Sequence, residues 1–178
     1  MTIRWERFNI YLLAALAAAA ACGCQSTGET NPKKMLSTLR LHLEATRDGP
    51  KASERVPIYR DKPVWLYVEN SPFLTEGVVA EASVIEVMGG FALSIRFDRS
   101  GAGVLEQFSV VNRGRKIAIF SQFGDKMKDY RWLAAPVISH RISDGVLVFT
   151  PDATREEAEE IARGLNNVAR KIHTWIDK

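Results

Sequence analysis

Apolar and polar residues alternate in two early stretches of the chain, and such alternation predicts β-strands. In residues 38–45, TLRLHLEA, the side chains of Leu39, Leu41 and Leu43 fall on one side and the polar side chains on the other, as in a half-buried strand. Residues 64–69, VWLYVE, alternate in the same way and contain aromatic and β-branched residues, so they predict a second strand.

A turn signal separates the next two alternating stretches. Residues 83–88, SVIEVM, and residues 91–98, FALSIRFD, flank the pair Gly89-Gly90. Because glycine adopts positive φ without a steric penalty, the pair predicts a two-residue hairpin turn.

Two further strands are expected in the second half of the chain. Residues 116–123, KIAIFSQF, indicate one strand. Residues 144–149, DGVLVF, indicate another, which an Asp-Gly turn opens. The second run is almost continuously apolar, which is typical of a central strand covered on both faces.

Helical spacing replaces alternation between these strands. In residues 100–114, Val104, Phe108 and Val111 fall near one stripe of a helix. Gly114 follows the last turn and predicts the C-terminal stop of this helix.

The last helix begins at a capping box formed by Thr154 and Glu157. Four glutamates lie in or near its first turns, where the helix dipole favours negative charge, so we attribute the acidic run to the helix start rather than to a metal site. The apolar stripe of this helix comprises Ala158, Ile161, Ala162, Leu165, Val168 and Ile172.

The order of these elements predicts an α+β domain with a mostly antiparallel sheet and two main helices packed on one face. We expect Phe97, Ile119, Leu147 and Leu165 to share one core between the sheet and the helices. The expected domain is single and spans residues 35–178.

The N-terminus has the pattern of an export signal. A positive head precedes the apolar run Ile10–Ala21, which is shorter than the roughly 20 residues that a helix needs to cross a bilayer. The run ends in the small residues Ala19, Ala20 and Ala21, and Cys22 follows directly, an arrangement that resembles the lipobox of bacterial lipoproteins. We therefore expect residues 1–21 to be a lipoprotein signal peptide, Cys22 to carry lipid, and residues 22–34 to form a polar tether. Two alternatives stay open: lipid on Cys24, or a secreted protein with unlipidated thiols.

This reading implies an exported protein that is lipid-anchored in the cell envelope and faces the periplasm. In the sorting rule of enteric bacteria, an aspartate directly after the lipidated cysteine retains a lipoprotein at the inner membrane. That position is occupied by Gly23 after Cys22, or by Gln25 after Cys24, and neither is aspartate. The outer membrane is therefore favoured over the inner one.

The composition narrows the classes of function. Lys and Arg number 24 and Asp and Glu number 21, and the two signs are interspersed, so the sequence does not indicate a nucleic-acid partner. No cysteine follows Cys24, which excludes disulfides and cysteine-based metal sites from the folded part. No later segment is apolar for long enough to span a membrane.

A series of short motifs over roughly residues 76–168 resembles one known module. The motifs are a glycine before a strand that ends in phenylalanine (Gly90, Phe97), an Asn-x-Gly helix end (112–114), an Ala-Pro-x-Ile segment (135–138), an Ile-x-x-Gly hairpin (142–145) and a Thr-x-x-Glu-Ala helix (154–158). In order and spacing they resemble the head subdomain of the first periplasmic domain of SecD, a protein-export membrane protein.

The resemblance implies a two-layer α+β module that contacts exported polypeptide or components of the translocon. Proton-driven translocation is not implied, because in that family it depends on membrane-spanning helices, which are not expected in this chain. The alternative is that the head scaffold is reused in a structural or partner-binding envelope lipoprotein unrelated to export.

The sequence does not indicate catalytic chemistry. His42, His140 and His173 are far apart, and there is no Gly-x-Ser-x-Gly elbow or phosphate-binding loop. The glycines of residues 101–103 lack the dinucleotide-binding pattern, and Asp144 fits a hairpin turn for backbone reasons alone. We expect no enzymatic activity, no cofactor and no metal.

One segment is a candidate partner surface. Residues 121–132, SQFGDKMKDYRW, are expected to form a loop, in which Phe123, Tyr130, Arg131 and Trp132 are the candidate contact residues. Aromatic residues and arginine are enriched at interface hot spots. The alternative is that the aromatic rings cap the core while the charges keep the loop soluble.

Overall fold

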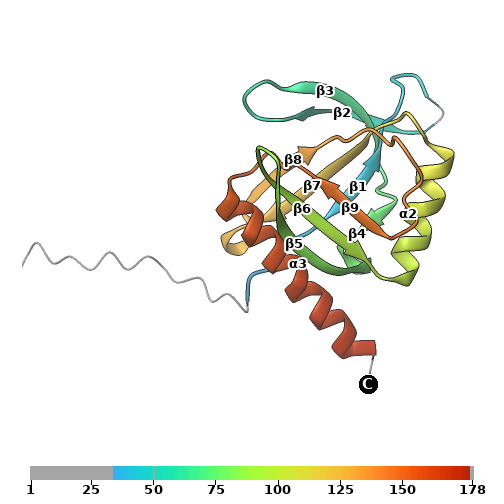
Figure 1. The fold of residues 1–178 in the computed structure, drawn as a ribbon. Coiled ribbons are helices and arrows are strands. Elements are labelled where there is room, and N and C mark those ends of the chain that lie inside the picture. The colour runs from blue at the N-terminus through green and yellow to red at the C-terminus, as the bar shows by residue number, and fades with distance from the viewer. Residues whose placement is uncertain (1–33, 50, 177–178) are drawn as a thin grey trace, which may run out of the picture.

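Antiparallel pairing joins all nine strands in the described part of the chain, residues 34–49 and 51–176 of this computed structural model (Figure 1). The strands are β1 (Arg40–Leu43), β2 (Ser53–Ile58), β3 (Val64–Glu69), β4 (Leu74–Thr75), β5 (Val79–Val87), β6 (Gly90–Phe97), β7 (Ile117–Phe123), β8 (Asp129–Ala134) and β9 (Val146–Phe149). The helices are α2 (Arg99–Val111) and α3 (Arg155–Ile176), with two 3₁₀ turns, η1 (Glu76–Val78) and η2 (Asp125–Met127).

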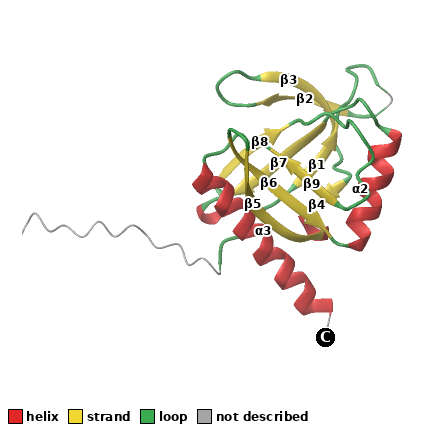
Figure 2. Cartoon of the chain, viewed as in Figure 1, coloured by secondary structure: helices red, strands yellow, loops and turns green. Residues whose placement is uncertain are grey.

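The strands form three sheets with the orders β4-β1-β7-β8, β5-β6-β9 and β2-β3 (Figure 2). The α+β class and the antiparallel pairing are as predicted. The strands of the single expected sheet are divided among three sheets, and in the largest of them residues 40–43 of β1 pair with residues 117–120 of β7. Such long-range pairing leaves no mark on the local alternation of residues.

The main core lies between the four-stranded sheet, the three-stranded sheet and both helices. Phe97, Ile119, Leu147 and Leu165 belong to it, and none is more than 5% exposed, so this prediction is confirmed. On the three-stranded sheet, Leu93 and Ile95 of β6 lie in this core, while Arg96 between the core positions is exposed. The alternation predicted for β6 is therefore also confirmed.

A second, smaller core covers the opposite face of the four-stranded sheet. The β2–β3 ribbon places Val56, Ile58, Leu66 and Val68 there, around Ala118 of β7. The predicted phase of β1 is confirmed, because Leu41 and Leu43 lie in the main core and Arg40 is exposed. The expectation that the whole opposite face is exposed was wrong for His42, which the second core covers. His42 is 6% exposed, its Nδ1 lies 2.8 Å from the Glu69 carbonyl oxygen, and its ring packs edge-on against Trp132.

Two details of the strands differ from the prediction. Val87 pairs with Gly90, so the hairpin loop is Met88-Gly89, one residue earlier than expected, and Gly89 takes the positive φ of 87°. The apolar strand β9 lies at a sheet edge rather than at the centre, and Val148 is 46% exposed. A run of four apolar residues is too short for its pattern to distinguish an edge strand from a central one.

Helix α2 begins where the Asp98 side chain accepts a hydrogen bond from the Gly101 amide at 2.8 Å. The helix ends as predicted, with Gly114 just beyond it at a φ of 88°. Its buried stripe is centred on Leu105, however, and Val111, which the sequence placed on the buried stripe, is 75% exposed. The true stripe includes Gly101, which an apolar pattern does not reveal.

Helix α3 begins at the predicted capping box. The Thr154 amide donates to Glu157 Oε2 at 2.8 Å, and the Glu157 amide donates to Thr154 Oγ1 at 3.2 Å. The side-chain amide of Asn166 forms two 2.8 Å hydrogen bonds with the backbone of Ala82. It thereby pairs the amide and carbonyl groups of this residue at the outer edge of β5. The other edge of this sheet is β9, which has no strand beyond it.

Candidate functional site

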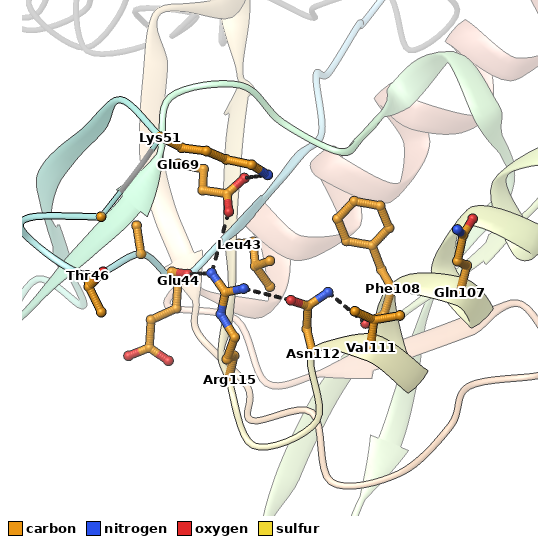
Figure 3. A pocket seen from close by; sticks show the side chains of 12 residues that line it. Leu43, Glu44, Thr46, Lys51, Glu69, Gln107, Phe108, Val111, Asn112 and Arg115 are labelled. Carbon is orange, nitrogen blue, oxygen red and sulfur yellow. Dashed lines mark hydrogen bonds and ion pairs between the residues drawn. The ribbon is translucent and has the colours of Figure 1, made fainter.

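A cleft of ≈ 750 Å³ opens between the C-terminal end of α2 and the segment that follows β1 (Figure 3). Leu43 contributes from the end of β1, and Phe108 and Val111 contribute from successive turns of α2. Helix α2 ends at this point because Asn112 leaves the helical conformation and Gly114 turns the chain away. The helix end therefore presents the exposed Val111 side chain at the rim of the cleft.

A polar network joins the segments at one side of the cleft. Arg115 Nη1 donates to Asn112 Oδ1 at 2.6 Å, and Arg115 Nη2 contacts the Glu44 carbonyl oxygen and lies 3.4 Å from Glu69 Oε1. Lys51 Nζ lies 2.7 Å from Glu69 Oε2 (Figure 3). Because one carboxylate faces both cations, the network binds the loop after β1 to β3 and to the end of α2.

The cleft combines apolar and polar groups. Leu43, Phe108 and Val111 make most of its exposed surface apolar, although seven of the twelve lining residues are polar or charged. The two cations Lys51 and Arg115 share Glu69 as their carboxylate partner. Such a cleft suits an apolar side chain flanked by groups that form hydrogen bonds. Within residues 34–49 and 51–176, no three side chains of the His, Cys, Asp and Glu types gather as a metal site would require.

The other positions considered for chemistry have structural contacts. Asp144 Oδ1 accepts a hydrogen bond from the Val146 amide at 3.1 Å, which is the turn role expected of it. His140 is exposed, and its Nδ1 lies 2.9 Å from Ser139 Oγ. Gly101 packs so tightly that an added Cβ would lie 2.9 Å from the Val78 side chain, so this glycine serves close packing.

The candidate partner segment is a hairpin rather than a loop. Residues 121–123 end β7, residues 129–132 begin β8, and the two strands pair. Alternation along the hairpin turns Phe123 into the core at 1% exposure, so it is not accessible as a contact residue. Strand β8 was not predicted from the sequence, because the charged residues around η2 interrupt the pattern of alternating residues that would indicate a strand.

The other three candidate contact residues, Tyr130, Arg131 and Trp132, are exposed to solvent to different degrees. Arg131 lies with its guanidinium 5.0 Å from the centre of the Phe123 ring and donates to both Glu157 oxygens at 2.8 and 2.9 Å. Trp132 is half-buried, with its ring centre 5.2 Å from those of His42 and Phe120. Tyr130 is 69% exposed, and contact with a partner at this residue stays a prediction.

The carboxyl group of Glu157 has an altered pKa. Burial raises this pKa, but hydrogen bonds from Arg131 and from the Thr154 amide, with the charges of Arg131 and Arg60, outweigh burial and lower the pKa below its ordinary value. The ion pair therefore fixes the β8 strand to the start of α3.

The cleft was not among the sequence predictions. Its residues come from positions 43–51, 69 and 107–115, and no motif links these three regions of the sequence. The nearest signal was Val111, which the sequence assigned to the core. Cys22 and Cys24 lie outside the described residues. No helix in the described part of the chain is long and apolar enough to cross a membrane.

Comparisons with known proteins identify a family that this chain matches and solved structures that share its fold. The family model for the SecDF P1 head subdomain matches residues 53–169. A solved structure of SecDF, a membrane component that enhances protein export, is 22% identical with a TM-score of 0.53 over 75% of this chain and 63% of that one. A crystal structure of SecDF in a super-membrane-facing form is 23% identical with a TM-score of 0.54 over 74% of this chain and 19% of that one. No curated protein matches significantly.

Proposed function

Because the chain belongs to the SecDF P1 head subdomain family, we propose that it is a non-enzymatic binding module for exported polypeptide. In this proposal the mature protein begins at Cys22, or at Cys24 in the shifted register, and carries lipid there. The lipid holds it in the cell envelope facing the periplasm, with the outer membrane favoured. The chain spans less than two thirds of either SecDF structure, so the proposal concerns the head module alone.

The observation that carries the proposal is the mostly apolar cleft at the end of α2. Val111 is 75% exposed and stands beside the half-buried Phe108, so an apolar surface is available without rearrangement of the core. An extended polypeptide presents apolar side chains that a folded protein buries. Selective binding of unfolded chains follows from that difference.

The polar side of the cleft supports binding that does not depend on one particular sequence. Asn112 and Arg115 line the cleft together with Val111 (Figure 3). Arg115 already contacts Asn112, Glu44 and Glu69, so in this proposal a bound backbone exchanges part of these contacts for its own hydrogen bonds. Every polypeptide offers backbone carbonyl and amide groups whatever its side chains are. We expect modest affinity, because ordering a flexible chain costs several kcal/mol, roughly 2–5.

A pair of neighbouring valines provides the test. Val111 lines the cleft, whereas Val110 is 56% exposed and does not line it. In a titration of the purified full chain against a fluorescent unfolded secretory polypeptide, Val111→Glu should weaken binding about tenfold, since it removes roughly 1.5 kcal/mol of apolar contact. Val110→Glu should leave the affinity within about twofold of the parent protein, as expected for a side chain that meets no ligand.

Both substitutions lie at exposed positions, so thermal unfolding should show similar stability for the two variants. Equal weakening by both substitutions would indicate a general charge effect and contradict binding in the cleft. If the parent protein and both variants fail to bind unfolded chains, the result favours the alternative in which the head scaffold serves a role unrelated to export. Crosslinking in cells from Tyr130, the exposed member of the predicted contact residues, would then identify the partner.

A further inference from the structure

The point where the chain enters the folded domain is fixed on helix α3. Met35 is 7% exposed, and Asn167 Nδ2 donates to its carbonyl oxygen at 2.8 Å. Ser37 crosses the helix at Gly164, where an added Cβ would lie 2.1 Å from Ser37 Oγ and 2.6 Å from the Ser37 amide nitrogen. The first coloured residues of the trace accordingly meet α3 partway along its length (Figure 1). Any tether that precedes Met35 must start from this side of α3.

Basic side chains surround this entry point. Lys34 precedes Met35, and Arg163, Arg170 and Lys171 lie on the turns of α3 around Gly164 and Asn167; all four side chains are exposed. Arg163 and Arg170 are seven residues apart and so lie on nearly the same face of the helix. Within the described residues, none of the four cations forms an ion pair. We call these four residues the entry surface.

The carboxylates around the entry surface are either engaged in other contacts or lie on its N-terminal side along α3. Glu76 of η1 accepts a hydrogen bond from the Leu39 amide at 3.1 Å, and Glu81 of β5 pairs with Arg96. The glutamates of α3 are Glu156, Glu157, Glu159 and Glu160, and the last two lie one turn before Arg163 on neighbouring positions of the helix surface. The excess of positive charge therefore lies on the C-terminal side of Arg163, at Arg170 and Lys171, and at Lys34, which precedes Met35.

We propose that the entry surface rests on the anionic phospholipid headgroups of the membrane that holds the lipid anchor, and so sets the orientation of the domain. This inference rests on the lipid anchor of the proposed function. Residues 22–34 would join the anchor to the entry surface, and a chain of that length reaches at most roughly 45 Å whatever its conformation. The tether would thus keep the four cations at a high effective concentration beside the headgroups.

The expected attraction follows from the number of charges. Each basic residue close to an anionic bilayer strengthens binding about fivefold, so removal of three weakens it roughly a hundredfold. The cleft lies at the end of α2, far from the C-terminal end of α3 (Figure 1). A domain that rests on its entry surface would point the cleft away from the membrane, towards polypeptide in the surrounding compartment.

Energy transfer in vesicles tests the orientation. The lipidated full chain, with its other native cysteine replaced by serine, is labelled through Thr174→Cys near the entry surface or through Gln107→Cys at the cleft. It is reconstituted into phosphatidylcholine vesicles with an acceptor on the headgroups, with or without phosphatidylglycerol. With phosphatidylglycerol, the label at 174 should transfer more energy than the label at 107. The difference should shrink in phosphatidylcholine alone and at about 1 M salt, where the Debye length is about 3 Å.

Charge variants decide whether the entry surface is responsible. Neutralising Arg163, Arg170 and Lys171 to glutamine should abolish the difference between the labels. The matched control neutralises three other exposed cations that form no ion pair in the described residues, Lys62→Gln, Arg99→Gln and Lys128→Gln, and should preserve it. Circular dichroism checks that both variants fold.

The outcomes separate this proposal from the proposed function. Equal transfer from both labels on lipidated chains, or the same loss in the control variant, overturns the orientation and leaves polypeptide binding untouched. An orientation that persists without phosphatidylglycerol also overturns it. N-terminal mass spectrometry identifies chains without lipid, a result that would remove the anchor and this proposal together.

Discussion

The contact between Ser37 and Gly164 predicts that a substitution normally favourable in a helix is destabilising here. Gly164→Ala should gain about 1 kcal/mol from helix propensity. The new Cβ would, however, lie 2.1 Å from Ser37 Oγ and 2.8 Å from the Leu36 carbonyl carbon, and a backbone neighbour cannot simply rotate away. The segment around Met35 must therefore move off α3.

The cost of that displacement is set by what the segment buries. Exposing the Met35 side chain, now 7% exposed, costs about 1.5–3 kcal/mol. Losing the hydrogen bond from Asn167 to Met35 costs a further 0.5–1.5 kcal/mol or so. Set against the gain in propensity, the net loss in the free energy of unfolding is about 1–3 kcal/mol.

Urea unfolding followed by circular dichroism measures this difference. Gly103→Ala in α2 is the matched control, because no atom lies within 4 Å of its added Cβ, and it should stabilise the protein by roughly 0.5–1 kcal/mol. The two glycine-to-alanine substitutions should thus shift the urea midpoint in opposite directions. If Gly164→Ala stabilises as much as Gly103→Ala, the docking of the N-terminal segment on α3 is incorrect.

Three further predictions follow from the core, the ion pair and the N-terminus. Leu165→Ala should lower the free energy of unfolding by about 2–5 kcal/mol in the same urea assay, because Leu165 is fully buried, and a loss below about 1 kcal/mol would contradict that burial. Glu157→Gln should destabilise at pH 7; since the folded-state pKa of Glu157 is lowered, its contribution is present above the ordinary Glu pKa of about 4.3 and is lost as pH falls through the folded value. A destabilisation that is constant from pH 7 to about pH 2 would mean that the charge of Glu157 is not responsible. Mass spectrometry of the mature N-terminus should find lipid on Cys22; lipid on Cys24 would shift the register, and two unmodified thiols would refute the anchor.

Local signals in the sequence were sufficient for the elements that depend on neighbouring residues. The capping box at Thr154 depends on atoms within one turn, and the alternation of β6 depends on a single strand with one face in the core. Gly114 was recognised as a helix stop because a glycine just after the last apolar position of a helix is a local signal, and its positive φ agrees with that role. In each case the interaction that fixes the structure is also visible in the local sequence.

Features built from distant residues were missed or misplaced. His42 was predicted to face solvent because nothing near it in the sequence shows that the β2–β3 ribbon and Trp132 cover it. Phe123 was named as a candidate contact residue because the sequence did not show the partner strand β8; its burial agrees with the alternative that the aromatic rings cap the core. The cleft joins three separate regions of the chain, so the exposed Val111 resembled a core residue in the helical pattern.

The most direct test of the central claim is whether the full chain binds unfolded polypeptide in preference to folded protein. One labelled secretory protein is titrated twice, once held unfolded and once folded, with no nucleotide, metal or nucleic acid present. The account predicts binding of the unfolded form with modest affinity and much weaker binding of the folded form. Equal binding of both forms, or no binding at high micromolar concentrations of the chain, would contradict a role in handling exported polypeptide.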